Sequence, residues 1–165
     1  MSDYYIEQKF FSFPPKFNVM NSDGTSVFNV RGQLIAAGKT LFVNDMDGNH
    51  LVKIHHKIPA LRPTYSITEL SSGRTVSLKK KFTLLEQKYL VDGTDWTVKG
   101  EITDHSYTIT DSKGNRIGEI NKEFFTFTDC FHISAAASTD DLIVLGITIA
   151  IDAVLDAQER FEDVD

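Results

Sequence analysis

The 165-residue chain lacks several features that would assign it to a class at once. Its single cysteine, Cys130, excludes an internal disulfide and is typical of a reducing compartment. No run of 18 apolar residues occurs, and the longest apolar stretch, 142–151, is too short to cross a bilayer. The opening MSDYYIEQKFF lacks the basic start and apolar run of a signal peptide. We therefore expect a soluble, cytoplasmic protein.

The chain also lacks an excess of positive charge. It has 17 Lys and Arg against 23 Asp and Glu, a formal net charge of −6. Eight of the acids follow residue 138, where Arg160 is the one base, so the remainder is nearly neutral. This balance does not favour nucleic acid as a partner. The length and the hydrophobic content of 41% fit a single globular domain, residues 1–165.

What the chain does contain is an internal repeat. Four segments share apolar residues at five positions: IEQKFFSFPPKFNV, IHHKIPALRPTYSI, LKKKFTLLEQKYLV and INKEFFTFTDCFHI. The first and third are followed by the related FNVRGQ and WTVKGE, so the chain divides into two halves, 6–77 and 78–138. We predict that the five positions mostly face the core. They are Ile6/Ile54/Leu78/Ile120, Phe10/Ile58/Phe82/Phe124, Phe13/Leu61/Leu85/Phe127, Phe17/Tyr65/Tyr89/Phe131 and Val19/Ile67/Val91/Ile133.

The local pattern within each half is that of short strands. β-Branched and aromatic residues alternate with polar ones, as in Phe17-Asn-Val19, and Gly-containing turns recur about every 8–12 residues. We predict a mainly β fold of about twelve strands, six in each half. A long meander of this kind removes its exposed edges by closing, so the two pseudo-symmetric halves should form a closed antiparallel barrel.

The segment after Ala137 has a different pattern. Hydroxyl and acidic residues at 138–141 are typical of a helix start, and an almost continuous apolar run follows. A helix that is apolar on every side must be buried on every side, so we place a central helix, 139–160, in the barrel lumen. From Asp152 the pattern becomes amphipathic, since Asp152, Asp156 and Arg160 share one face. Asp152 should therefore reach solvent, and an acidic tail, 161–165, follows.

These features together resemble a known family. The phenylalanine-rich K-x-x-S-F repeat, the D-x-x-G-N turns and the apolar terminal helix are similar to those of the LURP-one-related proteins, over about residues 3–160. The resemblance implies the tubby C-terminal-like fold, a twelve-stranded barrel around a central helix. Tubby domains bind phosphoinositides, and phospholipid scramblases resemble the same fold. The family has no catalytic signature, and no lipid-binding motif of tubby maps onto this sequence.

Three groups of residues could support chemistry or metal binding. Cys130 and His132, next to Asp129, could form a nucleophilic pair, but the repeat aligns them with polar, outward positions and no third group orients them. His55 and His56 should point to opposite faces of a strand, and the sequence does not show whether His50 or His105 lies nearby. The segment 45–49 is similar to a calcium loop but has Gly in the wrong position, which favours a hairpin turn.

The strongest functional hint is a run of lysines. Lys79, Lys80 and Lys81, with Lys53 and Lys57, could form a basic patch for phosphate or lipid headgroups, although charges on a strand also prevent edge pairing. We expect a non-enzymatic binding module without a cofactor or metal, with anionic lipid headgroups at the inner membrane surface as its partner. The alternative is a protein-interaction or stress-signalling scaffold that binds no lipid. The sequence names no ligand, pathway or oligomeric state.

Overall fold

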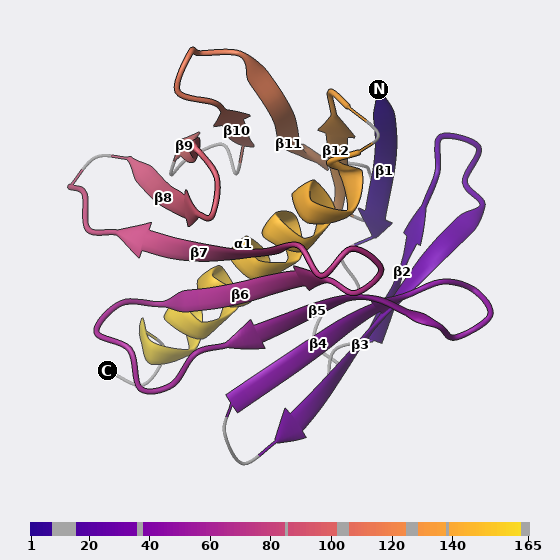
Figure 1. Cartoon of the computed structure of the whole chain (residues 1–165), viewed down its shortest axis with the longest axis horizontal. Helices are drawn as coiled ribbons and strands as arrows, with labels where there is room; N and C mark the ends of the chain where they lie inside the picture. The colour runs from indigo at the N-terminus through magenta and orange to yellow at the C-terminus, as the bar shows by residue number, and fades with distance from the viewer. Residues whose placement is uncertain are drawn as a thin grey trace.

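The computed structural model describes residues 1–7, 16–35, 38–84, 86–101, 106–124, 129–137 and 139–162; side chains are not described at 34–35, 123–124, 129 and 156–162. Within these residues the chain forms twelve strands and one helix (Figure 1). The strands are β1 (Ser2–Glu7), β2 (Lys16–Met20), β3 (Ser26–Ile35), β4 (Gly38–Asn44), β5 (His50–His56), β6 (Thr64–Glu69), β7 (Thr75–Lys81), β8 (Gln87–Asp92), β9 (Trp96–Glu101), β10 (Ser106–Thr110), β11 (Arg116–Phe124) and β12 (Asp129–Ala135), and the helix is α1 (Asp141–Glu162).

The strands form a closed barrel. Each strand pairs antiparallel with its neighbours in sequence, and β12 pairs with β1 to complete the circle. Closure pairs the edge strands, which removes the free hydrogen-bonding edges that invite aggregation. The predicted fold class, a mainly β closed antiparallel barrel with one C-terminal helix, is confirmed.

The strand register repeats along the chain. Residues aligned by the internal repeat pair with equivalent partners, because both halves contain the same succession of strands. Examples are Ile6↔Val19 with Leu78↔Val91, Phe17↔Val30 with Tyr89↔Val98, and Gly32↔Leu41 with Gly100↔Tyr107. The internal repeat in the sequence is therefore also a repeat in the pairing register of the strands.

The repeated positions mostly face the core, as predicted, but the second and third positions depart from this pattern. The first and last positions are buried in all four segments, and the fourth is buried in all but Phe17, which is half-buried. Ile58, Leu61 and Phe82, however, are exposed. They lie in the β5–β6 and β7–β8 loops, where the chain has left the sheet and alternation no longer sets the direction of a side chain. The side chains at the remaining second and third positions are not among those that the structure describes: Phe10, Phe13, Leu85, Phe124 and Phe127.

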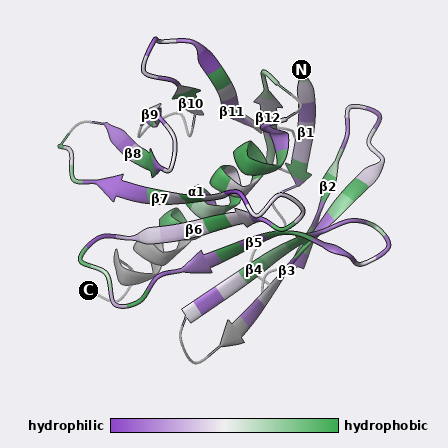
Figure 2. Cartoon of the chain, viewed as in Figure 1, coloured by the Kyte–Doolittle hydropathy of each residue, from purple (hydrophilic) through white to green (hydrophobic). Residues whose placement is uncertain are grey.

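The helix α1 occupies the barrel interior. Residues 143–151 are buried, whereas Leu142 is half-buried. Figure 2 shows the hydrophobic colour along this part of the helix. Gly118 and Gly146 allow this fit, because a Cβ atom at either position would lie under 3.0 Å from Val144 or Ile67. Asp152 is exposed, as predicted, and the helix begins at Asp141 and continues to Glu162.

Two polar contacts hold the start of α1. The Arg74 guanidinium, in the turn between β6 and β7, forms an ion pair of 2.7 Å with Asp140 and lies over the Trp96 ring. The Tyr4 hydroxyl on β1 donates a hydrogen bond of 2.8 Å to Asp141. Opposite walls of the barrel are thus tied to the same end of the helix. In the described part of the chain, no helix is both long and apolar enough to span a membrane.

Candidate functional site

The predicted lysines lie on β5 and β7, which are separated by β6. Lys57 follows β5, and its amide donates to Thr64, which in turn is opposite Lys79 on β7. The Lys57 ammonium reaches across β6 and donates to the Ser77 hydroxyl at 3.1 Å. Lys57 and Lys79 are therefore brought to one part of the outer barrel face.

Lys53 is not brought into this group. It lies opposite Thr68 on β6, which pairs with Thr75 near the start of β7. Lys53 is four residues before Lys57 on one strand, a separation of roughly 13 Å at about 3.3 Å per residue. The sequence suggested grouping Lys53 with the other lysines because of their shared charge and on the condition that their strands are neighbours, but β6 separates β5 from β7.

The register reveals a lysine row that sequence reasoning missed. Lys81 on β7 lies opposite Lys88 on β8, and Lys88 lies opposite Lys99 on β9. All three side chains alternate with the inward-facing residues Leu78, Tyr89 and Val98, so they share the outer face. Neighbouring strands are about 4.8 Å apart, so the lysine row (Lys81, Lys88 and Lys99) is roughly 10 Å wide at the backbone.

The lysine row is electrostatically unfavourable by itself. Like charges directly opposite one another on a sheet are destabilising. Within the described residues, no carboxylate lies within ion-pair distance of any of the three lysines. Glu86 and Glu101 are the nearest acids along these strands. The row therefore presents concentrated positive charge to solvent.

The two lysines beside the row are less available. Lys79 forms an ion pair with Asp92 on β8. Lys80 alternates toward the barrel interior, where burial lowers the pKa of its ammonium. Of the three consecutive lysines, Lys81 is thus the one that belongs to the row. Lys88 and Lys99 could have been predicted as neighbours of Lys81 from the register of the β7–β8 and β8–β9 hairpins. That prediction requires the turns of both hairpins to be placed correctly in the sequence.

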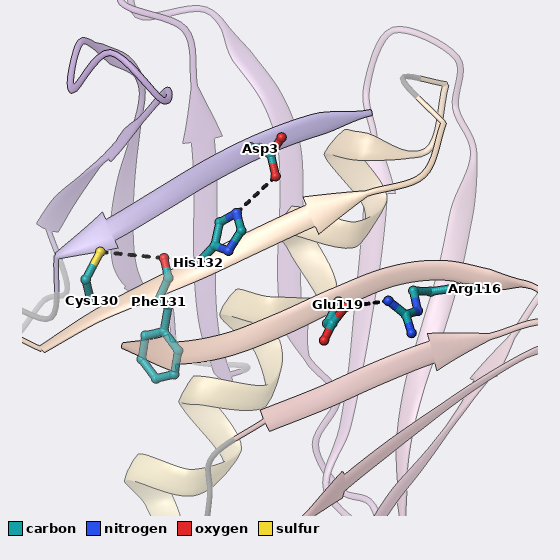
Figure 3. Close-up of polar contacts among 6 residues, drawn as sticks. All are labelled: Asp3, Arg116, Glu119, Cys130, Phe131 and His132. Carbon is teal, nitrogen blue, oxygen red and sulfur yellow. Dashed lines mark hydrogen bonds and ion pairs between the residues drawn. The ribbon is translucent and has the colours of Figure 1, made fainter. Parts of the chain in front are cut away.

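The Cys130–His132 candidate acquires an orienting group that the sequence did not show. His132 Nε2 is 2.9 Å from an Asp3 carboxylate oxygen on β1 (Figure 3). The His132 ring also stacks on the ring of Tyr5. Cys130, by contrast, is only 6% exposed, and its thiol lies 3.7 Å from the carbonyl oxygen of Phe131. Cys130 alternates with the inward-facing Phe131 and Ile133, so it lies on the outer face as predicted, but it is covered there. A buried thiol is a poor nucleophile, so this arrangement supports packing of β12 on β1.

The histidines of β5 lie as the strand period predicts. His55 shares a hydrogen bond of 2.8 Å with the Thr40 hydroxyl, whereas His56 stacks on Tyr65 with ring centroids 4.7 Å apart. Burial, with the nearby charges of Lys39 and His55, lowers the pKa of His56. His105 lies outside the described residues. Among the residues described, no three His, Cys, Asp or Glu side chains are placed to hold a metal ion.

The segment 45–49 is a hairpin turn, as predicted. One oxygen of Asp45 accepts the main-chain amides of Asp47 and Asn49 at 3.0 and 2.8 Å, and the other accepts the Asn49 side chain. These hydrogen bonds hold the pKa of the Asp45 carboxyl below its usual value. Gly48 has φ +92°, which only Gly adopts easily. The same arrangement recurs at Asp111 with Asn115. Both carboxylates therefore stabilise hairpin turns by accepting hydrogen bonds from residues of the same turn.

A small cavity lies inside the barrel among the described residues. This cavity of about 60 Å³ lies beside the C-terminal half of α1, far smaller than the roughly 300 Å³ and more of typical small-molecule sites. Apolar side chains form most of its lining, including Phe17 and Phe131 from the wall and Ile149 from the helix. Glu7 and Asp152 are the charged residues among those described there. Burial and the charge of Asp152 raise the pKa of Tyr107 to about 12.

The fold and these sites define a class: a closed antiparallel barrel filled by its own C-terminal helix, with its distinctive charge on the outer wall. The LURP-one-related family model matches residues 2–152, and the chain belongs to this family. The chain is 31% identical to the uncharacterized protein YxjI of Bacillus subtilis (strain 168), over 94% of each chain. It is 28% identical to protein LURP-one-related 6 of Arabidopsis thaliana, over 82% of this chain and 75% of that protein. No solved structure matches.

Proposed function

We propose that this protein is a non-enzymatic binding module whose outer barrel wall binds anionic lipid headgroups at a membrane surface. The lysine row carries the proposal. Three lysines held opposite one another cost stability, and an anionic surface removes that cost by supplying the missing negative charge. Each lysine near such a surface contributes about 1 kcal/mol to binding.

Two further observations support this function over the others considered. The net charge of −6 does not favour a long-range attraction to nucleic acid, whereas a local basic row can still contact a headgroup layer. The cavity beside the C-terminal half of α1 is small and mostly apolar, so that cavity does not favour a substrate site. The protein would therefore act at the membrane periphery, through its wall.

Sedimentation with vesicles tests the proposal. Wild-type protein should sediment with phosphatidylcholine vesicles that contain phosphatidylserine, should not sediment with phosphatidylcholine alone, and should be released by salt. The Lys81→Gln/Lys99→Gln variant loses two row lysines and should bind about 30-fold more weakly, since about 1 kcal/mol is lost at each position.

A matched control removes the same charge elsewhere. Lys53 and Lys113 are both exposed, and Lys113 lies in the β10–β11 turn at the other end of the barrel. The Lys53→Gln/Lys113→Gln variant should therefore bind almost as wild type. Equal losses in the two variants would mean that only net charge matters. Absence of wild-type binding at low salt would refute the proposal and favour the alternative, a protein-interaction scaffold.

A further inference from the structure

Four large apolar side chains are exposed on two loops at one end of the barrel. In the β5–β6 loop, Ile58 is 59% exposed and Leu61 102%. In the β7–β8 loop, Phe82 is 73% exposed and Leu84 98%. Leu61 and Leu84 are thus as exposed as in an extended chain. Figure 2 shows hydrophobic colour in both loops.

The two loops are neighbours in space. β6 and β7 pair directly, so the loop that precedes β6 and the loop that follows β7 leave the sheet side by side (Figure 1). The Lys80 amide donates to the Pro63 carbonyl at 3.1 Å, which ties the two segments together. The Arg62 guanidinium lies 5.3 Å from the centre of the Phe82 ring. The apolar side chains therefore form one surface with cations among them.

This surface adjoins the lysine row. Phe82 directly follows Lys81, and the β7–β8 loop returns to the sheet at Gln87, one residue before Lys88. The lysines of the row lie on the barrel wall, and the apolar side chains of the two loops lie beyond the end of that wall. Peripheral membrane proteins use this order, because lysines remain with the headgroups while apolar and aromatic side chains enter the boundary below them.

We propose that the apolar tips, Leu61, Phe82 and Leu84, insert into an anionic bilayer while the lysine row rests on its headgroups. This inference rests on the proposed function, and it adds the orientation and the depth of the bound protein. Charge complementarity favours an anionic bilayer as the partner, since the two loops and the strand ends beside them carry Lys57, Arg62, Lys81 and Lys88 against the single acid Glu86. The C-terminal end of α1, with exposed Asp152, emerges at the same end of the barrel (Figure 1), so the contact should be made through the loops and the lysine row and not through the helix. The barrel would stand with its β5–β6 and β7–β8 loops toward the membrane and its β4–β5 turn away from it.

Tryptophan substitution at the tips reports insertion. The chain has one tryptophan, Trp96, which is 8% exposed and serves as a constant background. On addition of phosphatidylserine-containing vesicles, the added emission of Leu61→Trp and of Leu84→Trp should shift to shorter wavelength and be quenched by brominated lipid. Met46, 56% exposed in the β4–β5 turn, provides the control: Met46→Trp should show neither change.

A second variant tests the energetic role of the tips. Leu61→Ser/Leu84→Ser should melt like wild type, because both side chains are already exposed, yet bind the same vesicles about tenfold more weakly or worse. Binding that survives in this variant while the added tryptophans stay unshifted would overturn insertion and leave headgroup binding intact. No wild-type sedimentation would overturn both, and would assign the tips to a protein partner.

Discussion

Gly146 lies so close to Ile67 that a Cβ atom at position 146 would be 2.6 Å from Cγ2 of Ile67. The closest approach of α1 to β6 therefore depends on the absence of a side chain. In an exposed helix, replacing Gly by Ala would add about 1 kcal/mol of stability. Here the added methyl group must displace a buried side chain in a closed barrel.

We expect Gly146→Ala to lower the free energy of unfolding by about 1–3 kcal/mol, the usual cost of overpacking. Ile67→Ala removes the obstructing Cγ2 atom and leaves a cavity, so it should cost about 2–5 kcal/mol by itself. The double variant should lose less than the sum of the two, because the new methyl group partly fills that cavity. Urea denaturation measures the free energy of unfolding of all three variants. A Gly146→Ala protein that is more stable than wild type would contradict the close packing of Gly146 against Ile67.

A charge in the middle of α1 should be far more damaging. Ile147 is fully buried, and Ile147→Asp places a carboxylate where no partner is available, so the expected loss of several kcal/mol approaches the whole stability of a small domain. Ile147→Val, which removes one methylene, should cost only about 0.5–1.5 kcal/mol. Circular dichroism melts separate the two, and a cooperative, near-wild-type melt of Ile147→Asp would contradict a helix buried in the lumen.

Neutralising the middle of the lysine row should affect stability and binding in opposite directions. Lys88→Gln relieves repulsion with both Lys81 and Lys99, so the free energy of unfolding should rise by about 0.2–1 kcal/mol at low salt, and less at high salt. The same variant should bind anionic vesicles more weakly. Thermal melts at two salt concentrations provide the measurement. A fall in stability at low salt would show that the three charges do not repel one another.

Alkaline pH should destabilise the barrel through Tyr107. Burial and the charge of Asp152 raise its pKa to about 12, whereas an unfolded tyrosine titrates near 10. Its contribution is therefore complete below pH 10 and is lost as the pH rises toward 12, because only the unfolded chain ionises in that window. Tyr107→Phe removes the titrating hydroxyl, so it should lose less stability than wild type between those pH values. Equal losses would contradict the raised pKa.

Much of the architecture was predictable from particular residues. Alternation identified Val19, Ile67 and Val91 as inward-facing, and the uninterrupted apolar run around Ile147 required a site that covers every side of a helix. The recurring Asp and Asn turns placed the hairpins. Where alternation stops, the repeat no longer predicts burial: Ile58, Leu61 and Phe82 occupy repeated apolar positions but lie exposed in loops.

The candidate site was predictable only in part. Sequence drew attention to Lys79, Lys80 and Lys81, but the fold pairs Lys79 with Asp92 and turns Lys80 inward. It joins Lys81 instead to Lys88 and Lys99, which are seven and eighteen residues away in sequence. Asp3, likewise, meets His132 only because the barrel closes between its first and last strands.

The difference between the features that the sequence predicted and those that it did not predict has a physical cause. The sequence by itself determined what depends on local periodicity and on the cost of leaving apolar surface in water: strands, turns, a buried helix and a barrel to contain it. Only the tertiary structure decided which charges face one another and which apolar side chains stay outside. Those outcomes depend on strand register and on where each strand ends, and neither is encoded within a single segment.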